Sequence, residues 1–281
     1  NALAGVINLI TKKTQQNKIE SEVNGYYESV GNYNVNATAG LKVKNHFLQL
    51  GGGRYFFKGW NDGKYDRDLS WDPKEVYFAD LSYVYRTKND WFNRFKLSFF
   101  DDKMLDRKDQ NGPFTIADDQ WFKTRKIDAA YILNGTYKTN YYLQSTNSYN
   151  NYRRIKNTYT KDLATLSSTL KDNTAFSTFQ DTTTLQQFAS RTFIAYNPKE
   201  SKINFQLGYD LNVATGKGGR LKDENNNAIV MTDIAAFASF TYKPNEKLSI
   251  QPAVRYGFNS KFTTTPTLSA TIKYDISKKV I

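Results

Sequence analysis

Residues 141–156, YYLQSTNSYNNYRRIK, combine tyrosines with cations. Tyrosine offers a flat apolar ring with a polar tip, and arginine binds carboxylate or phosphate groups through two parallel hydrogen bonds. This combination suits an anionic, partly aromatic chelate. An aromatic band at a membrane surface, with Arg and Lys contacting lipopolysaccharide phosphates, is the alternative interpretation. The residues predicted to contact the chelate are Tyr149, Tyr152, Arg154 and Lys156.

Residues 61–72, NDGKYDRDLSWD, gather carboxylates around a glycine. A Ca²⁺ ion takes several oxygen ligands, so this composition permits a calcium site. The segment lacks the D-x-[DN]-x-[DN]-G spacing and the distal glutamate of an EF-hand loop. Lys64 and Arg67 offer the alternative, in which cations in the same loop neutralise the acids. The candidate calcium ligands are Asp62, Asp66 and Asp68.

The composition excludes several kinds of catalytic and metal chemistry. The chain has 281 residues, no Cys and a single His, which removes disulfides, cysteine nucleophiles, thiolate metal sites and multi-histidine centres. The carboxylate pairs Asp101-Asp102 and Asp118-Asp119 fall in a predicted solvent-exposed loop, where ordinary pKa values are expected. His46 falls in a predicted short turn, so a solvated histidine is favoured over an axial haem ligand. We therefore expect no enzyme.

The net charge of +12, from 39 Lys and Arg against 27 Asp and Glu, is compatible with an anionic partner. Nucleic acid, phosphorylated lipid and a small anionic ligand all meet that description. The basic residues are scattered singly, and neither a phosphate-binding loop nor a recognition helix accompanies them. We expect no nucleic-acid partner.

The proportions of aromatic and aliphatic residues are unusual for a soluble domain. Aromatic residues make up 15% of the chain, yet the whole hydrophobic class reaches only 39%. Such a chain is either disordered or a barrel with one polar face and one face toward lipid. Alternation decides for the barrel, since every second residue from Ile203 to Val213 is apolar. Runs of about 9–11 residues favour membrane-spanning strands over those of a β-sandwich, which are nearer 5–6.

Short and long connections alternate along the chain, as in barrels that use turns on one side of a membrane and loops on the other. We predict about twelve strands between residues 18 and 276. The longest loop contains three leucines at helical spacing behind Asp162, which predicts a short helix over 162–170. Short breaks are predicted at 44–46, 86–90, 138–140, 197–201 and 243–247, and longer ones at 58–74, 101–120, 154–183 and 215–228.

Parity assigns each strand residue to one face, because neighbouring side chains of a strand point to opposite sides. With Leu143 taken as facing lipid, Arg153 also faces lipid and is predicted to contact a lipopolysaccharide phosphate. Arg154 then faces the lumen. In the second half of the chain we predict lipid contact for Leu207, Tyr209, Val254, Tyr256, Leu268 and Ile272, and a lumen orientation for Gln206, Asp210, Arg255 and Lys273.

The opening residues 2–13, ALAGVINLITKK, resemble the segment that closes the plug domain of TonB-dependent outer-membrane receptors. In that family a small-residue turn leads into a G-V-I-N-I-I-T-K strand. Residues 235–244, AAFASFTYKP, resemble the family's A-x-F-x-x-x-x-Y-K-P strand. The resemblance implies an all-β fold, an antiparallel transmembrane β-barrel of about 22 strands filled by a plug. Residues 1–14 then end the plug, residues 15–281 form the N-terminal part of the barrel, and about ten strands lie outside this sequence.

The same resemblance implies energised import across the outer membrane of a Gram-negative bacterium. A small-molecule ligand binds, and the partner TonB pulls on a segment N-terminal to Asn1. Asn8-Leu9-Ile10 stands where the glycan-importing branch has another pattern, which favours an iron-siderophore chelate, haem or cobalamin as the ligand. Cobalamin receptors of the family can order extracellular loops with calcium. The alternatives are a receptor-like barrel that docks a surface lipoprotein or a secretion complex, and a glycan importer of the same fold.

Overall fold

The computed structural model describes residues 17–61, 67–111, 115–175, 177–198, 201–219, 221–225 and 227–275. These residues form one antiparallel sheet of 13 strands in chain order, except that the short β8 pairs only with β7. The residues expected to end a plug, 1–14, lie outside the described residues. The strands are β1 (Ile19–Glu28), β2 (Asn32–Val43), β3 (His46–Phe57), β4 (Lys74–Arg86), β5 (Phe92–Gln110), β6 (Ile116–Tyr137), β7 (Tyr141–Asp162), β8 (Ser168–Leu170), β9 (Gln180–Tyr196), β10 (Ile203–Lys217), β11 (Ile229–Tyr242), β12 (Leu248–Asn259) and β13 (Thr267–Tyr274).

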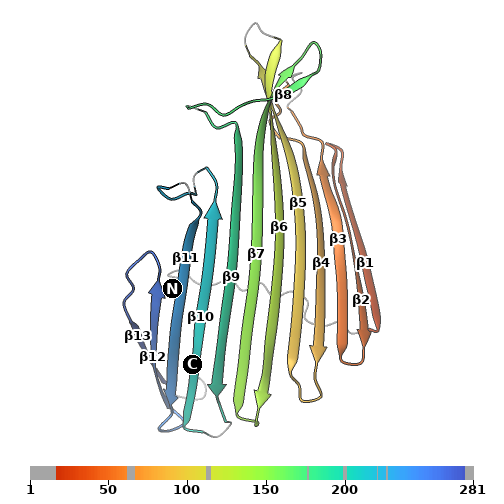
Figure 1. Cartoon of the computed structure of the whole chain (residues 1–281). Coiled ribbons are helices and arrows are strands. Elements are labelled where there is room, and N and C mark those ends of the chain that lie inside the picture. Colours follow the sequence, from red (N-terminus) through yellow and green to blue (C-terminus); the bar gives the residue numbers. More distant parts are fainter. Residues whose placement is uncertain are drawn as a thin grey trace.

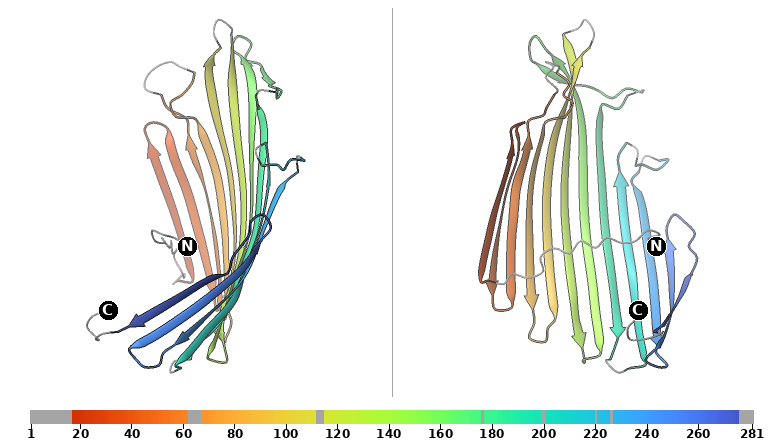
Figure 2. Two further views of the ribbon diagram at one scale, coloured as in Figure 1. Left: turned by 90° about the vertical axis from the view of Figure 1, so that its left-hand side faces the viewer. Right: turned by 180° about the vertical axis from the view of Figure 1, so that it is seen from behind.

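The sheet is curved, with β1 at one edge and β13 at the other (Figure 1). Figure 2 shows β12 and β13 turned away from the direction of the strands at the opposite edge. One end of the sheet has short connections throughout, as predicted, and the other has the long ones except at 29–31 and 111–115, which defines a short-turn end and a long-loop end. The described residues contain no helix capable of crossing a membrane. The short connections are 44–45, 87–91, 138–140, 197–202 and 243–247, and the longer ones include 58–73, 163–179, 218–228 and 260–266.

Residues 101–120 do not form the predicted loop. They belong mainly to β5 and β6, which continue well past the apolar part of the sheet, so β6 and β7 reach 22 residues each. Ion pairs to other segments hold four of the six aspartates of this polar stretch. Because the partners are distant in sequence, no local pattern reveals them. The four pairs are Asp101–Arg125, Asp102–Lys74, Asp118–Lys171 and Asp119–Arg67.

The helix predicted over 162–170 is also wrong. The Asp162 carboxylate accepts hydrogen bonds from the backbone N–H groups of Ala164 and Thr165, both at 2.8 Å, so the expected capping interaction does form. These bonds lower the pKa of Asp162, which lies far beyond the apolar part of β7. They close a turn, after which the chain pairs as β8 with the part of β7 beyond Asn157, where pairing with β9 has ended.

The strand register gives the sheet two chemically different sides. We call the side that carries Leu143, Ile194 and Leu207 the apolar face, and the side that carries Gln144 and Gln206 the polar face. The division in the second half of the chain is the predicted one. Leu207, Tyr209, Val254, Tyr256, Leu268 and Ile272 share the apolar face, and Gln206, Asp210, Arg255 and Lys273 share the polar face.

No other part of the described chain covers the apolar face. Leu97 is 40% exposed, Leu207 49% and Leu268 76%. Burial within the sheet is slight, because the described residues form no second layer on either side of it. An exposed apolar surface this large requires an apolar surrounding such as lipid. The buried apolar residues of the described ranges are Val76, Leu105, Ala117 and Ala235.

The polar face carries hollows as well as charges. Two depressions at the short-turn end, one over β1–β5 and one over β9–β13, are lined mainly by its polar side chains. On this face Asp210 forms an ion pair with Arg255 and lies 3.5 Å from Arg191. In β9, β10 and β12, these charges therefore lie on the side that a barrel would close around.

His46 is the first residue of β3 and not a turn residue, because the turn before it holds only residues 44–45. The Nδ1 atom lies 2.7 Å from the Tyr83 hydroxyl. The ring stacks on Tyr85, with centroids 4.7 Å apart. The histidine is thus exposed, as expected, and belongs to an aromatic group on the apolar face at the short-turn end.

Gly208 on the polar face of β10 allows aromatic side chains to pack directly on the backbone. A Cβ atom there would lie 2.5 Å from the Phe237 ring and 2.5 Å from the Thr192 carbonyl oxygen. We expect Gly208→Val to lower the unfolding free energy by about 1–3 kcal/mol, because the ring and the backbone must both move. Gly25→Val is the matched control, since a Cβ atom there meets nothing within 4 Å. Unfolding midpoints in urea test this, and equal midpoints for the two variants would contradict it.

Candidate functional site

The ligand-contact residues predicted from the sequence all lie on β7, which pairs with β6 over its whole length. Tyr152, Arg154 and Lys156 alternate along the strand and therefore share the polar face. Tyr149 lies on the apolar face, opposite Phe188 of β9, and is 40% exposed there. The structure brings three of the four residues together and separates the fourth by the thickness of the sheet.

The cations on this part of the polar face lie against a phenylalanine of β6. The guanidinium of Arg154 lies 4.9 Å from the centroid of the Phe122 ring. Lys156 is directly opposite Phe122 in the register, and its Nζ donates to the Thr178 carbonyl oxygen at 3.4 Å. A cation over an aromatic face keeps its N–H groups at the edge free to bind an anion. We call Tyr152, Arg154, Lys156 and Phe122 the ligand wall.

Phe122 and Lys126, which is opposite Tyr152 in the register, were not anticipated from the sequence. A loop is predicted as far as residue 120. The alternation of polar and apolar residues in β6, which places both side chains on one face, is therefore not followed toward the long-loop end. The alternation of Lys126 and Asp128 with Ile127 in the same strand was the available signal.

Within the ligand wall, Lys156 lies directly opposite Asp181 of β9 in the register, whereas the charge of Arg154 has no such acidic neighbour across the strand pairs. The nearby cations Lys126 and Lys171 pair with Asp128 at 2.9 Å and Asp118 at 2.7 Å. Arg154 is exposed, and no acidic group forms an ion pair with it in the described part of the chain. The arrangement can bind a carboxylate, phosphate or phenolate group against an aromatic surface.

Arg153 lies on the opposite side of β7 from Arg154, as parity predicts. It is exposed on the apolar face, directly opposite Arg125 of β6 and Thr184 of β9. Contact with a lipopolysaccharide phosphate stays a prediction. The two adjacent arginines therefore lie in different environments, Arg153 on the apolar face and Arg154 on the polar face.

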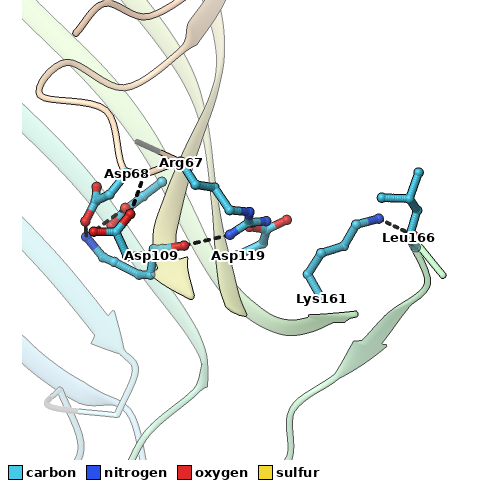
Figure 3. A network of polar contacts seen from close by, with 8 residues as sticks. Arg67, Asp68, Asp109, Asp119, Lys161 and Leu166 are labelled. Carbon is cyan, nitrogen blue, oxygen red and sulfur yellow. Dashed lines mark hydrogen bonds and ion pairs between the residues drawn. The ribbon is translucent and has the colours of Figure 1, made fainter. Parts of the chain in front are cut away.

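The connection between β3 and β4 folds back onto the long-loop ends of β5 and β6 (Figure 3). The Arg67 guanidinium forms an ion pair with Asp119 and donates to the Lys108 carbonyl oxygen at 2.7 Å. The backbone N–H of Asp68 donates to the Asp109 carboxylate at 3.2 Å. These contacts attach the loop to strands that are about 40 residues or more away in sequence.

Lys108 of β5 is a cation close to the described carboxylates of this loop, Asp68 and Asp72. Lys108 Nζ lies 3.8 Å from Asp68 and 2.8 Å from Asp106. Burial and the neighbouring Asp106 carboxylate raise the pKa of Asp72, which lies in the loop itself. The surplus of negative charge is therefore met in part by Lys108, and Arg67 of the loop is engaged with Asp119 instead.

The calcium prediction concerns three aspartates, of which Asp62 and Asp66 lie outside the described residues. The carboxylate of Asp68 faces Lys108. Within the ranges that the structure describes, no three His, Cys, Asp or Glu side chains are grouped as metal ligands. Calcium in this loop stays a proposal.

Comparisons with known proteins identify the architecture. No protein-family model and no curated protein matches the sequence. Among solved structures, the chain is similar to the copper transporter OprC, with a TM-score of 0.54 and 10% identity over 95% of this chain and 44% of that one. It is also similar to BauA, the ferric preacinetobactin receptor from Acinetobacter baumannii, with a TM-score of 0.51 and 10% identity over 85% and 43%. The chain spans less than half the length of either structure, and the shared feature is the fold of an outer-membrane β-barrel.

Proposed function

We propose that this chain forms part of the barrel wall of a TonB-dependent receptor in the outer membrane of a Gram-negative bacterium. The apolar face would contact lipid, the polar face would line the lumen, and the long-loop end would face outward. The intact protein would import a scarce small molecule with energy supplied through TonB, and it would not be an enzyme. The copper transporter and the ferric preacinetobactin receptor of the same fold support a transport function.

The observation that carries the proposal is the ligand wall. An exposed arginine without an ion-pair partner among the described residues, a lysine and two aromatic rings lie on the polar face near the long-loop end, where an entering ligand would pass. Charge-assisted hydrogen bonds together with a flat apolar surface fit an anionic iron chelate, haem or a cobalamin better than a neutral glycan. Calcium bound by the aspartate loop would be an accessory to this function.

Deleting the gene tests the proposal. We expect the deletion strain to lose growth and ligand uptake in one of three media, in which iron as a single chelate, haem or cobalamin is limiting. Disrupting TonB should cause the same loss, and the intact gene on a plasmid should restore uptake. Normal uptake of all three by the deletion strain would contradict import, and loss of a surface lipoprotein instead would indicate a docking role.

A further inference from the structure

Four cations lie side by side on the apolar face toward the long-loop end, on three neighbouring strands. Lys103 of β5 is directly opposite Lys123 of β6, and Arg125 of β6 is directly opposite Arg153 of β7. Lys123 and Arg125 are two residues apart on one strand, so the two pairs adjoin. We call Lys103, Lys123, Arg125 and Arg153 the cation cluster.

Direct opposition of like charges destabilises a sheet, because paired Cβ atoms are only about 5 Å apart. The acidic groups nearby do not remove this repulsion. Asp101 pairs with Arg125 at 2.8 Å, and Glu75, which is opposite Lys103, is engaged by Arg54. The four cations of the cluster and Arg54, together with the acids Asp101 and Glu75, leave a net charge of +3 in one small area.

Two members of the cation cluster, Lys123 and Arg153, carry charges that no ion pair within the described chain balances. Lys103 lies over the Trp121 ring, 4.3 Å from its centroid. Lys123 and Arg153 are exposed, and neither forms an ion pair with an acidic group in the described part of the chain. An unpaired exposed charge is ordinary in water, but here it lies on the face that is otherwise covered by lipid.

The depth of the cluster along the strands places it at a membrane surface. Tyr137 of β6 and Tyr141 of β7 form part of an aromatic row at the short-turn end, with Tyr141 and Tyr196 ring centroids 5.1 Å apart. Arg125 and Arg153 lie twelve residues above them, or about 40 Å along a strand. With a tilt of about 40°, the height is about 30 Å, slightly more than an apolar band of about 25 Å. The cluster therefore lies level with lipid headgroups.

We propose that the cation cluster is a binding site for the phosphate groups of a phosphorylated lipid in the surrounding leaflet. Arg153 and Arg125 present guanidinium groups able to bind phosphate through two hydrogen bonds each, and Lys123 and Lys103 add charge beside them. An anion between the opposed cations removes the repulsion that the sheet itself leaves. The site rests on the barrel fold and not on import, and it extends the single contact predicted for Arg153 to three strands.

The test uses the intact protein in phosphatidylcholine nanodiscs, with or without the phosphorylated glycolipid lipid A. The variant Lys123→Gln with Arg153→Gln removes two charges from the cluster. Its matched control, Arg154→Gln with Lys156→Gln, removes two charges from the other face of the same sheet. Thermal unfolding midpoints and lipid A retained after washing are measured for each.

We expect lipid A to raise the unfolding midpoint of the unaltered protein and of the control, but not of the cluster variant. In phosphatidylcholine alone the cluster variant should unfold at a higher temperature than the unaltered protein, because repulsion has been relieved. Lipid A retention should fall about tenfold in the cluster variant only. An equal lipid A effect in both variants would overturn the proposal, and so would a full effect of inorganic phosphate alone, which would indicate a free-anion site. Loss of nutrient uptake in the control alone would support the proposed import and would not bear on the lipid site.

Discussion

Leu97→Arg should lower the unfolding free energy of the protein in its membrane by about 1–3 kcal/mol, because the site lies within the apolar band but off its midplane. Leu97 lies on the apolar face of β5 between Leu81 and Ala129, and 40% of its surface is exposed there. It lies two residues from Phe99 on the same strand, toward the short-turn end and within the apolar band. An arginine there loses its hydration without gaining a partner. Urea unfolding of the protein folded into lipid vesicles measures the change.

Ser98→Arg is the control for this prediction, because Ser98 is the next residue of β5 and lies on the polar face opposite Asp80. An arginine there remains in a wet lumen and gains a carboxylate neighbour, so we expect a change of less than about 1 kcal/mol. A large loss for Ser98→Arg and a small one for Leu97→Arg would reverse the assignment of the two faces.

Arg154→Ala should weaken ligand binding about tenfold or more, whereas Arg153→Ala should barely change it. A charge-assisted contact to a ligand contributes roughly 1.5–3 kcal/mol, which corresponds to at least a factor of ten in Kd. Arg154 lies over Phe122 on the polar face, and Arg153 points to the opposite side of the sheet. Titration of the purified proteins with the ligand that the deletion strain fails to take up measures both affinities.

The two arginines are matched in size, charge and strand, so the comparison isolates the face. Equal, unaltered affinities would remove the ligand wall from the binding site. Loss in Arg153→Ala alone would place the ligand on the apolar side, which is incompatible with transport through the lumen. Phe122→Ala should reduce affinity less than Arg154→Ala, because it removes the surface under the guanidinium and leaves the charge in place.

Local patterns in the sequence were sufficient for the wall of the barrel. Strict alternation in residues 203–213 assigned faces that the register of β10 with β9 and β11 reproduces. Short polar breaks marked the turns at 44–45, 138–140 and 243–247. Both signals are local, because side chains alternate residue by residue and a tight turn uses only a few residues. The separation of Arg153 from Arg154 needed nothing more.

Only the tertiary structure decided how far the strands extend and which side chains meet across them. Residues 101–120 look like a loop because they are polar, and cross-strand ion pairs such as Asp101–Arg125 keep them in the sheet. The leucines behind Asp162 have helical spacing, but the exposed edge of β7 offers backbone hydrogen bonds to a strand. The opposition of Arg125 and Arg153 depends on a register set between two strands of 22 residues. Parity along one strand gives a face, whereas contact across strands depends on hydrogen bonds between residues far apart in sequence.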